Sequence, residues 1–256
     1  MQTQVQAQTQ APFGIDNDEL LQWNQNYKEI EKLEEKRRSG GGEDMNVLAI
    51  SGAANKSRNT ATMLKSAFDG AMSVSGASGE IVFLYDLSYK GCIGCHSCKL
   101  LDESKFARCA INDDLSPVLE KAIDADVLLI GSPIYYSDVT GETRSFLERY
   151  YFPGMTYNKD RVPTYPKRTK VGWVFTMNAP GEFYKDYFAG LVAMSNRIIG
   201  DSQYVMAYQT QQFEDYSMYA ASMFDVEMVK KRHITQFPKD CEAAFDMGKR
   251  LAESCS

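Results

Sequence analysis

The chain has 256 residues, of which 44% are hydrophobic and 24% are charged, and its formal net charge is −6. This composition is typical of a soluble globular protein, and the acidic balance argues against general nucleic-acid binding. No apolar run approaches the roughly 20 residues that cross a membrane, and the glutamine-rich start lacks the apolar segment of a secretory signal. We therefore expect a cytoplasmic protein with no membrane or nucleic-acid partner.

Residues 1–44 differ in composition from the rest and are predicted to form an extension. Residues 1–10 are rich in Gln and Thr and are expected to be disordered. A helix is predicted over 16–38, where Trp23 and Tyr27 share one face, and a Ser-Gly-Gly-Gly sequence follows it as a flexible joint. We favour a docking arm, on this chain or on a partner subunit, over a recruitment module. The globular domain is expected over 45–256.

The first predicted elements of that domain are a buried strand over 46–50, a polar loop over 51–60 and a helix from residue 60 to 72. Backbone amides at a helix start and nearby hydroxyls can surround one phosphate group. The chain lacks the glycine fingerprints of dinucleotide-binding Rossmann folds and of P-loops, so we expect a mononucleotide phosphate. An ordinary capped turn is the alternative interpretation. The candidate phosphate ligands are Ser51, Ser57, Arg58, Asn59 and Thr60.

A cluster of cysteines follows the second predicted strand. Cys92, Cys95, Cys98 and Cys109 have the spacing C-x2-C-x2-C-x10-C. The compact first part of this spacing is found around iron–sulfur clusters, whose ligands are cysteine thiolates. Zinc, with His96 as a further ligand, is a second interpretation, and metal-free thiols are a third. Structural disulfides are not expected in a reducing cytoplasm.

A short apolar strand predicted over 127–130 ends in the sequence Gly-Ser-Pro-Ile-Tyr-Tyr-Ser. The proline stiffens this loop, while the flanking amides and the two tyrosine rings can meet a flat ring system. In open α/β sheets, ligands bind outside the carboxyl ends of the strands. We therefore predict a loop that lines a flavin ring, and its candidate residues are Pro133, Ile134, Tyr135, Tyr136 and Ser137.

The remaining elements continue the alternation of strand and helix. Further strands are predicted over 80–85, 170–177 and 202–208, and further helices over 115–125, 140–150, 184–199 and 239–254. Five such units with right-handed crossovers predict an α/β flavodoxin-like three-layer sandwich with a five-stranded parallel sheet of order 2-1-3-4-5. In that order the first, third and fourth strands are neighbours, so the loop after the fourth strand reaches the same crevice. A simple turn is the alternative there. The candidate flavin-edge residues are Asn178, Ala179 and Gly181.

Three segments together resemble the NADPH-dependent FMN reductase family, and most of all its iron–sulfur flavoprotein branch. They are residues 51–60, the cysteine segment with the Asp113-Asp114 pair that follows it, and residues 131–135. The resemblance covers about residues 45–256. It implies non-covalently bound FMN, electrons taken from NAD(P)H or a ferredoxin-type donor, and assembly as a homodimer or homotetramer. It also makes a [4Fe–4S] cluster the candidate occupant of the four cysteines.

The loops and the resemblance together predict an FMN-dependent oxidoreductase that passes electrons from NAD(P)H, or a ferredoxin-type donor, to a small-molecule or protein acceptor. In such enzymes the flavin carries the chemistry and the protein positions it. No general acid or base can be assigned from the sequence. One alternative is an iron–sulfur flavoprotein that carries electrons without a small-molecule substrate. A binding or regulatory module that has lost redox turnover is another.

Overall fold

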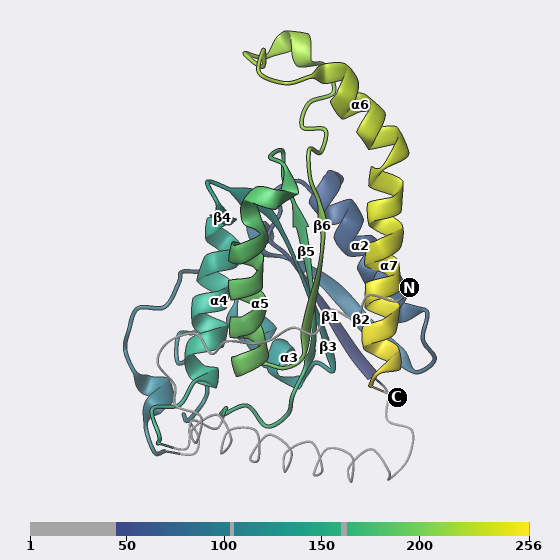
Figure 1. Cartoon of the computed structure of the whole chain (residues 1–256). Helices are drawn as coiled ribbons and strands as arrows, with labels where there is room; N and C mark the ends of the chain where they lie inside the picture. The colour runs from purple at the N-terminus through teal and green to yellow at the C-terminus, as the bar shows by residue number, and fades with distance from the viewer. Residues whose placement is uncertain (1–44, 103–104, 160–162, 256) are drawn as a thin grey trace.

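The structure is a computed structural model that describes residues 45–102, 105–159 and 163–255. The disordered start, the helix over 16–38 and its glycine joint, all predicted from the sequence, lie outside these residues. Figure 1 shows a central twisted sheet with helices on both of its faces. The alternation of strand and helix along the sequence therefore produces the three-layer arrangement that it predicts.

Five parallel strands form the sheet, in the order β2-β1-β3-β5-β6. Their bounds are β1 Met45–Ser51, β2 Ala77–Phe83, β3 Val127–Tyr135, β5 Lys170–Thr176 and β6 Ser202–Ala207. A short strand, β4 (Asp138–Val139), turns back and pairs antiparallel with the end of β3. The flavodoxin-like fold and its 2-1-3-4-5 strand order are thus confirmed.

The second strand differs in position from its prediction over 80–85. It begins at Ala77 and ends at Phe83, because Leu84–Asp86 forms a turn of 3₁₀ helix. Gly79 explains the earlier start, since a side chain there would collide with the carbonyl oxygen of Val47 on β1. A glycine lowers the strand signal in a sequence, yet here it permits the close approach of two backbones.

Helices cover the two faces of the sheet unequally. One face carries α2 (Asn59–Met72) and α7 (Phe237–Glu253), and the other carries α3 (Ser116–Asp124), α4 (Gly141–Gly154) and α5 (Lys185–Ile198). Along β1 the buried side chains alternate between these layers, because successive residues of a strand point to opposite faces. Among the described residues, no helix is long and apolar enough to cross a membrane.

The two helices of the first face cross with their backbones in contact. A methyl group at Gly70 of α2 would collide with the carbonyl oxygen of Phe245, and one at Gly248 of α7 would collide with that of Ala67. Both positions therefore require glycine. Because nothing separates the two helices here, α7 fixes the position of α2 on the sheet.

Residues 209–225 and helix α6 (Val226–Thr235) rise beyond the carboxyl edge of the sheet, at the top of Figure 1. This segment has a small apolar cluster of its own, centred on Tyr216, Ala221 and Val229. Satellite clusters of this kind form under long connections. The projection leaves large apolar side chains in contact with solvent, among them Met218 and Met223.

Candidate functional site

Three loops meet at the carboxyl edge of the sheet. Ser51 at the end of β1 is in register with Gly131 on β3, and the backbone N–H of Gly52 donates to the Gly131 carbonyl at 2.8 Å. Pro133 on β3 is in register with Thr176 on β5. The strand predicted to end at residue 130 continues to Tyr135, because β5 pairs with it as far as Pro133. The strand order therefore places the 51–60 loop, the end of β3 with its hairpin, and the 178–183 loop side by side.

The start of α2 leaves its first turn open to an anion. Its N-cap residue, Arg58, makes no side-chain capping bond, and the first turn contains no acidic residue. Helix α4 begins at the same edge but is capped by Thr140, whose hydroxyl oxygen accepts from the Thr143 N–H, and it has Glu142 in its first turn. The amides and the positive dipole end of α2 are therefore the ones suited to a phosphate.

The predicted phosphate ligands fall into two groups. Ser51 and Thr60 are buried, with exposed fractions of 0% and 4%. The Thr60 hydroxyl lies 2.6 Å from that of Thr176, and the Ser51 hydroxyl accepts from the backbone of its own loop at 3.4 Å. These two side chains hold the loop to the sheet. Ser57 and Arg58 are exposed and can meet a ligand.

The segment that follows β6 also belongs to this edge, although the sequence analysis did not include it. The Asn59 side chain donates to the carbonyl of Gln211 at 2.8 Å, and Arg58 pairs with the carboxylate of Glu214 at 2.9 Å. The signal that could have found it is topological. A fifth parallel strand beside β5 must end at the same edge, so its loop reaches the phosphate loop.

The predicted ring loop is a tight hairpin between β3 and β4. Tyr135 pairs with Asp138, so Tyr136 and Ser137 form a two-residue turn, with φ angles of 50° and 66°. Such turns ordinarily contain Asn or Gly, because positive φ strains other residues. Tyr135 and Tyr136 are both exposed, and Pro133 and the residue after it are half-buried. A strained turn that presents two tyrosines to solvent is consistent with a ligand site.

Side chains from two helices hold this hairpin in place. Asp138 accepts hydrogen bonds from Arg144 of α4 and Tyr187 of α5, and also from the backbone N–H of Val139 at 2.6 Å. Burial opposes ionisation of Asp138, but these hydrogen bonds outweigh it and lower the pKa of the carboxyl group. Asp138, Arg144 and Tyr187 carry no motif, so the sequence analysis missed them.

The third loop borders the other two. Asn178 is exposed and its amide donates to the side chain of Gln212, in the segment after β6. Ala179 is half-buried. Gly181 is buried, and a Cβ there would lie 3.1 Å from the Tyr208 ring, so this glycine lets the loop lie against β6. The loop therefore lies at the edge where a ring over residues 133–137 would end.

All four predicted cluster ligands line one small cavity of about 20 Å³. Cys92 and Cys95 are exposed, Cys109 is half-buried and Cys98 is buried. Burial raises the pKa of the Cys98 thiol, the Lys99 cation opposes this, and Cys109 and Cys92 raise the pKa further. Within the described residues, no three His, Cys, Asp or Glu side chains are yet gathered around one ion position. The four sulfurs are nevertheless the donor set that iron–sulfur clusters use.

The cysteine segment lies along α4. The Tyr89 hydroxyl donates to the carbonyl of Glu142 at 2.7 Å, and the backbone N–H of Cys92 donates to the Glu148 carboxylate at 3.1 Å. Further along, the Lys99 ammonium group donates to carbonyls at the C-terminal end of the helix. A cation there complements the negative end of the helix dipole. The cysteine segment is thus attached to the start, the middle and the end of α4.

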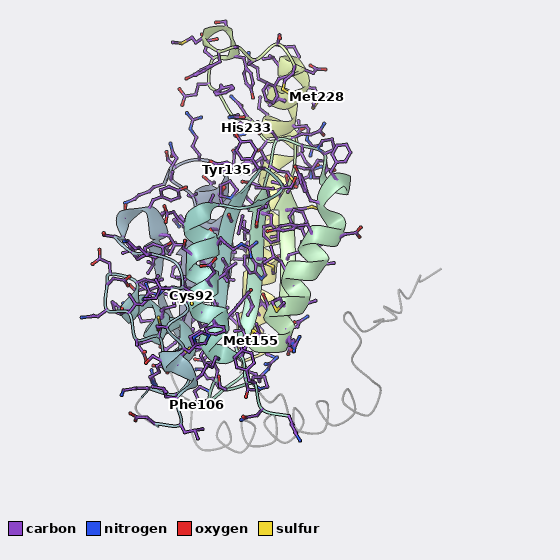
Figure 2. The ribbon with its side chains drawn as sticks, turned by 90° about the vertical axis from the view of Figure 1, so that its left-hand side faces the viewer. Cys92, Phe106, Tyr135, Met155, Met228 and His233 are labelled. Carbon is purple, nitrogen blue, oxygen red and sulfur yellow. The ribbon has the colours of Figure 1, made fainter. Side chains whose placement is uncertain are left out.

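Figure 2 shows the two candidate sites at different heights on one side of the molecule, with Tyr135 near the upper edge and Cys92 well below it. The first turn of α4 follows the ring hairpin directly, and its last turn receives Lys99. One helix therefore connects the two sites.

Backbone strain is confined to these regions. Five non-glycine residues of the described chain have positive φ: His96, Ala107, Tyr136, Ser137 and Gln209. The first two lie in the cysteine segment, the next two form the ring hairpin, and the last follows β6. Strain of this kind costs of order 1–3 kcal/mol per residue and clusters at functional sites.

Comparisons of sequence agree with this geometry. The sequence model of the NADPH-dependent FMN reductase family matches residues 45–166. An iron-sulfur flavoprotein of Archaeoglobus fulgidus is 37% identical to this chain, and one of Methanocaldococcus jannaschii is 33% identical, each over 105 residues. These matches cover 41% of this chain, 48% of the first relative and 51% of the second. The chain thus spans about half the length of the curated relatives that it matches.

Comparisons of structure show the same fold. An NAD(P)H:quinone oxidoreductase from Methanothermobacter marburgensis has a TM-score of 0.54 at 13% identity, over 81% of this chain and 99% of that one. An azoreductase from Bacillus anthracis has a TM-score of 0.55 at 8% identity, over 80% and 99% of the two chains. Residues 45–166 thus match the NADPH-dependent FMN reductase family in sequence, and the solved structures share the fold.

Proposed function

We propose that this protein binds FMN at the carboxyl edge of its sheet and passes electrons from NAD(P)H, or a ferredoxin-type donor, to a small-molecule or protein acceptor. The observation that carries this proposal is the adjacency of the uncapped start of α2 and the strained ring hairpin, across the neighbouring strands β1 and β3. When bound, FMN supplies the redox chemistry, and the protein determines where the ring and the phosphate lie.

Each loop has a role in this proposal. The α2 amides, Ser57, Arg58 and Asn59 hold the phosphate, while the buried Ser51 and Thr60 keep that loop in place. Backbone N–H groups near the ring stabilise the negative charge that reduction places on it. The ring is lined by Pro133, Ile134, Tyr135, Tyr136 and Ser137, and its far edge by Asn178, Ala179 and Gly181.

We also propose that the four cysteines bind a [4Fe–4S] cluster. All six cysteines are described, and none forms a disulfide. Support comes from the four sulfurs around one cavity and from relatives named as iron-sulfur flavoproteins. When bound, such a cluster exchanges single electrons.

A second candidate function is electron transfer between proteins without a small-molecule substrate. The attachment of the cysteine segment along α4, which begins at the ring hairpin, favours it, because this joins a one-electron site to the flavin edge through one rigid helix. Ile93 and Leu101 beside the cysteines are exposed and offer a partner an apolar contact.

Assembly into a homodimer or homotetramer is also part of the proposal. The exposed Met218 and Met223 of the projecting segment support it.

Anaerobic reconstitution tests these proposals. The full chain is incubated with FMN, ferrous iron and sulfide, desalted, and analysed for flavin, iron and sulfide per chain. Oxidation of NADPH and NADH is then measured with flavin and quinone acceptors. We expect about one FMN per chain, and faster nicotinamide oxidation with an acceptor present. A chain that takes up no FMN would instead be a binding or regulatory module. A chain that binds FMN and iron but oxidises no nicotinamide would be an electron carrier.

A further inference from the structure

Arg149 on α4 is a cation in the protein interior, with its side chain 0% exposed. Its Nε–H donates to the Cys109 sulfur at 3.3 Å, and one terminal nitrogen pairs with Asp113 at 2.6 Å. The guanidinium also donates to the carbonyls of Lys90 and Ile111, each at 3.2 Å. It therefore binds both ends of the cysteine segment, before Cys92 and after Cys109.

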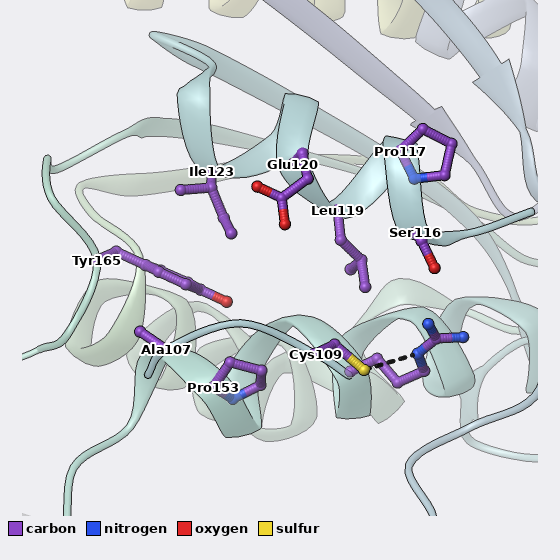
Figure 3. A pocket seen from close by; sticks show the side chains of 10 residues that line it. Ala107, Cys109, Ser116, Pro117, Leu119, Glu120, Ile123, Pro153 and Tyr165 are labelled. Carbon is purple, nitrogen blue, oxygen red and sulfur yellow. Dashed lines mark hydrogen bonds between the residues drawn. The ribbon is translucent and has the colours of Figure 1, made fainter. Parts of the chain in front are cut away.

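Packing alone does not fix the direction of the Cys109 side chain. Cys109 lines the small cavity that the other three cysteines also line. A second cavity, of about 180 Å³, adjoins the same residue and is also lined by Arg149 and Pro153 (Figure 3). Because empty space lies beside Cys109 in two directions, the directional N–H bond from Arg149 is the contact that orients it.

The buried charge of Arg149 also supports a specific role beside Cys109. A buried guanidinium carries a large desolvation cost, which a single carboxylate and a few carbonyls must offset. The ion pair with Asp113 at 2.6 Å offsets part of that cost, and an arginine side chain stays protonated in proteins. A fixed positive charge therefore lies beside Cys109 and donates a hydrogen bond to its sulfur.

We infer that Arg149 is a positioning residue, which turns Cys109 toward the other three cysteines so that it serves as the fourth cluster ligand. This inference rests on the proposed cluster. Cys109 needs such help, because ten residues separate it from Cys98 and the compact C-x2-C-x2-C run does not constrain it. Reduction adds one electron to a cluster, so the adjacent cation and its N–H···S bond also raise the reduction potential.

Arg149→Lys is the first test. Lysine keeps the positive charge but lacks the planar fork, so it cannot bond both Cys109 and Asp113 in the present geometry. After identical anaerobic reconstitution, we expect several-fold less iron and sulfide per FMN than in the wild type. Any cluster that does bind should have a lower midpoint potential in an anaerobic titration. FMN per chain should not change.

Asp113→Asn is the matched control. It removes the charge partner of Arg149 but leaves the donor to Cys109, and asparagine can still accept from the backbone N–H of Leu115 as Asp113 does. We expect wild-type iron content and a higher midpoint potential, because a negative charge near the cluster is lost. The two variants should therefore move the potential in opposite directions.

Three results separate the explanations. If both variants keep wild-type iron and potential and only melt at lower temperature, Arg149 merely holds the fold together and the inference is overturned. If the wild type itself binds no iron, the cluster proposal fails instead. If Arg149→Lys does not fold, Arg149→Met combined with Asp113→Asn leaves no buried charge unpaired, and it should still lose iron several-fold. Wild-type iron in that double variant also overturns the inference.

Discussion

The two candidate sites of this protein are built in different ways. The flavin edge consists of loops at the ends of neighbouring strands, so the hydrogen-bonded register of the sheet sets the spacing of the loops. The cysteine segment belongs to no strand of the sheet, and side-chain contacts with α4, together with the ion pair of Arg108 and Glu120 on α3, hold it. The shape of the first site follows from the backbone, whereas that of the second depends on a few polar contacts and on what binds there. Loss of one site should therefore leave the other intact.

The sharpest test of this independence is Cys95→Ala. Loss of one of four thiolate ligands should abolish bound iron and sulfide, whereas FMN per chain should stay at the wild-type level. Iron analysis, sulfide analysis and the visible spectrum after anaerobic reconstitution measure both. The control is Cys241→Ala, which removes a thiol that packs between α2 and α7. Simultaneous loss of FMN and iron would show that the two sites form one unit.

Ser57→Glu should weaken the flavin site and leave the cysteine site unchanged. Ser57 is exposed, so a carboxylate there should leave the fold intact while it repels a phosphate at the start of α2. We expect the Kd for FMN to rise about tenfold, which corresponds to roughly 1.4 kcal/mol, with no change in iron content. Fluorescence titration with FMN measures it. Lys65→Gln, on the exposed face of the same helix, lowers the net charge by the same one unit and is the control for charge alone. Equal affinity in Ser57→Glu and the wild type would contradict the phosphate site.

Glu214→Gln should strengthen binding rather than weaken it. In the structure Glu214 pairs with Arg58, the cation that faces the phosphate site, and the two side chains are 84% and 44% exposed. An exposed pair is worth about 0–1 kcal/mol, so releasing Arg58 should lower the Kd for FMN by up to a few-fold. Added salt should shrink this difference, because it screens the charges. A higher Kd in the variant would mean that the pair organises the loop for the ligand.

Asp138→Asn should have the smallest effect. The pKa of Asp138 is lower in the folded protein than in the unfolded chain, so its ionised form stabilises the fold above the ordinary pKa of about 3.9. That contribution disappears as the pH falls through the folded-state pKa. We expect the variant to melt a little below the wild type at pH 7, with the difference in melting temperature closing as the pH falls below the ordinary pKa of about 3.9. A gap that stays constant across this range would exclude ionisation of Asp138 as its cause.

The same contrast explains what the sequence could predict. Strand order follows from the alternation of apolar runs and helices, and the order then brings the ends of β1, β3 and β5 together. The convergence of the three loops is predictable for that reason. Burial of Ser51 and Thr60 is not, because whether a hydroxyl in a loop faces the sheet or the ligand depends on partners such as Thr176, far away in the chain.

For the cysteines, the spacing predicts a ligand set but not what holds it. Arg149 lies in an ordinary helical pattern, and nothing near it in sequence marks it as the partner of Cys109, 40 residues earlier. Asp138 and Tyr187 are similar, since each is polar and unremarkable in its own segment. Contacts between side chains of different elements leave no local signal, and such contacts hold the cysteine segment and the ring hairpin.

If FMN binds as proposed, the contact of α2 and α7 at Gly70 and Gly248 means that the affinity for FMN can be altered from a distance. Helix α2 is a rod of 14 residues whose first turn faces the phosphate site, roughly 17 Å from Gly70 at the usual rise of 1.5 Å per residue. A methyl group at Gly248 would lift α2 off α7, and a rigid rod carries such a tilt to its far end. Helix α7 therefore sets the position of the 51–60 loop, and substitutions in α7 can change the Kd for FMN without contacting it.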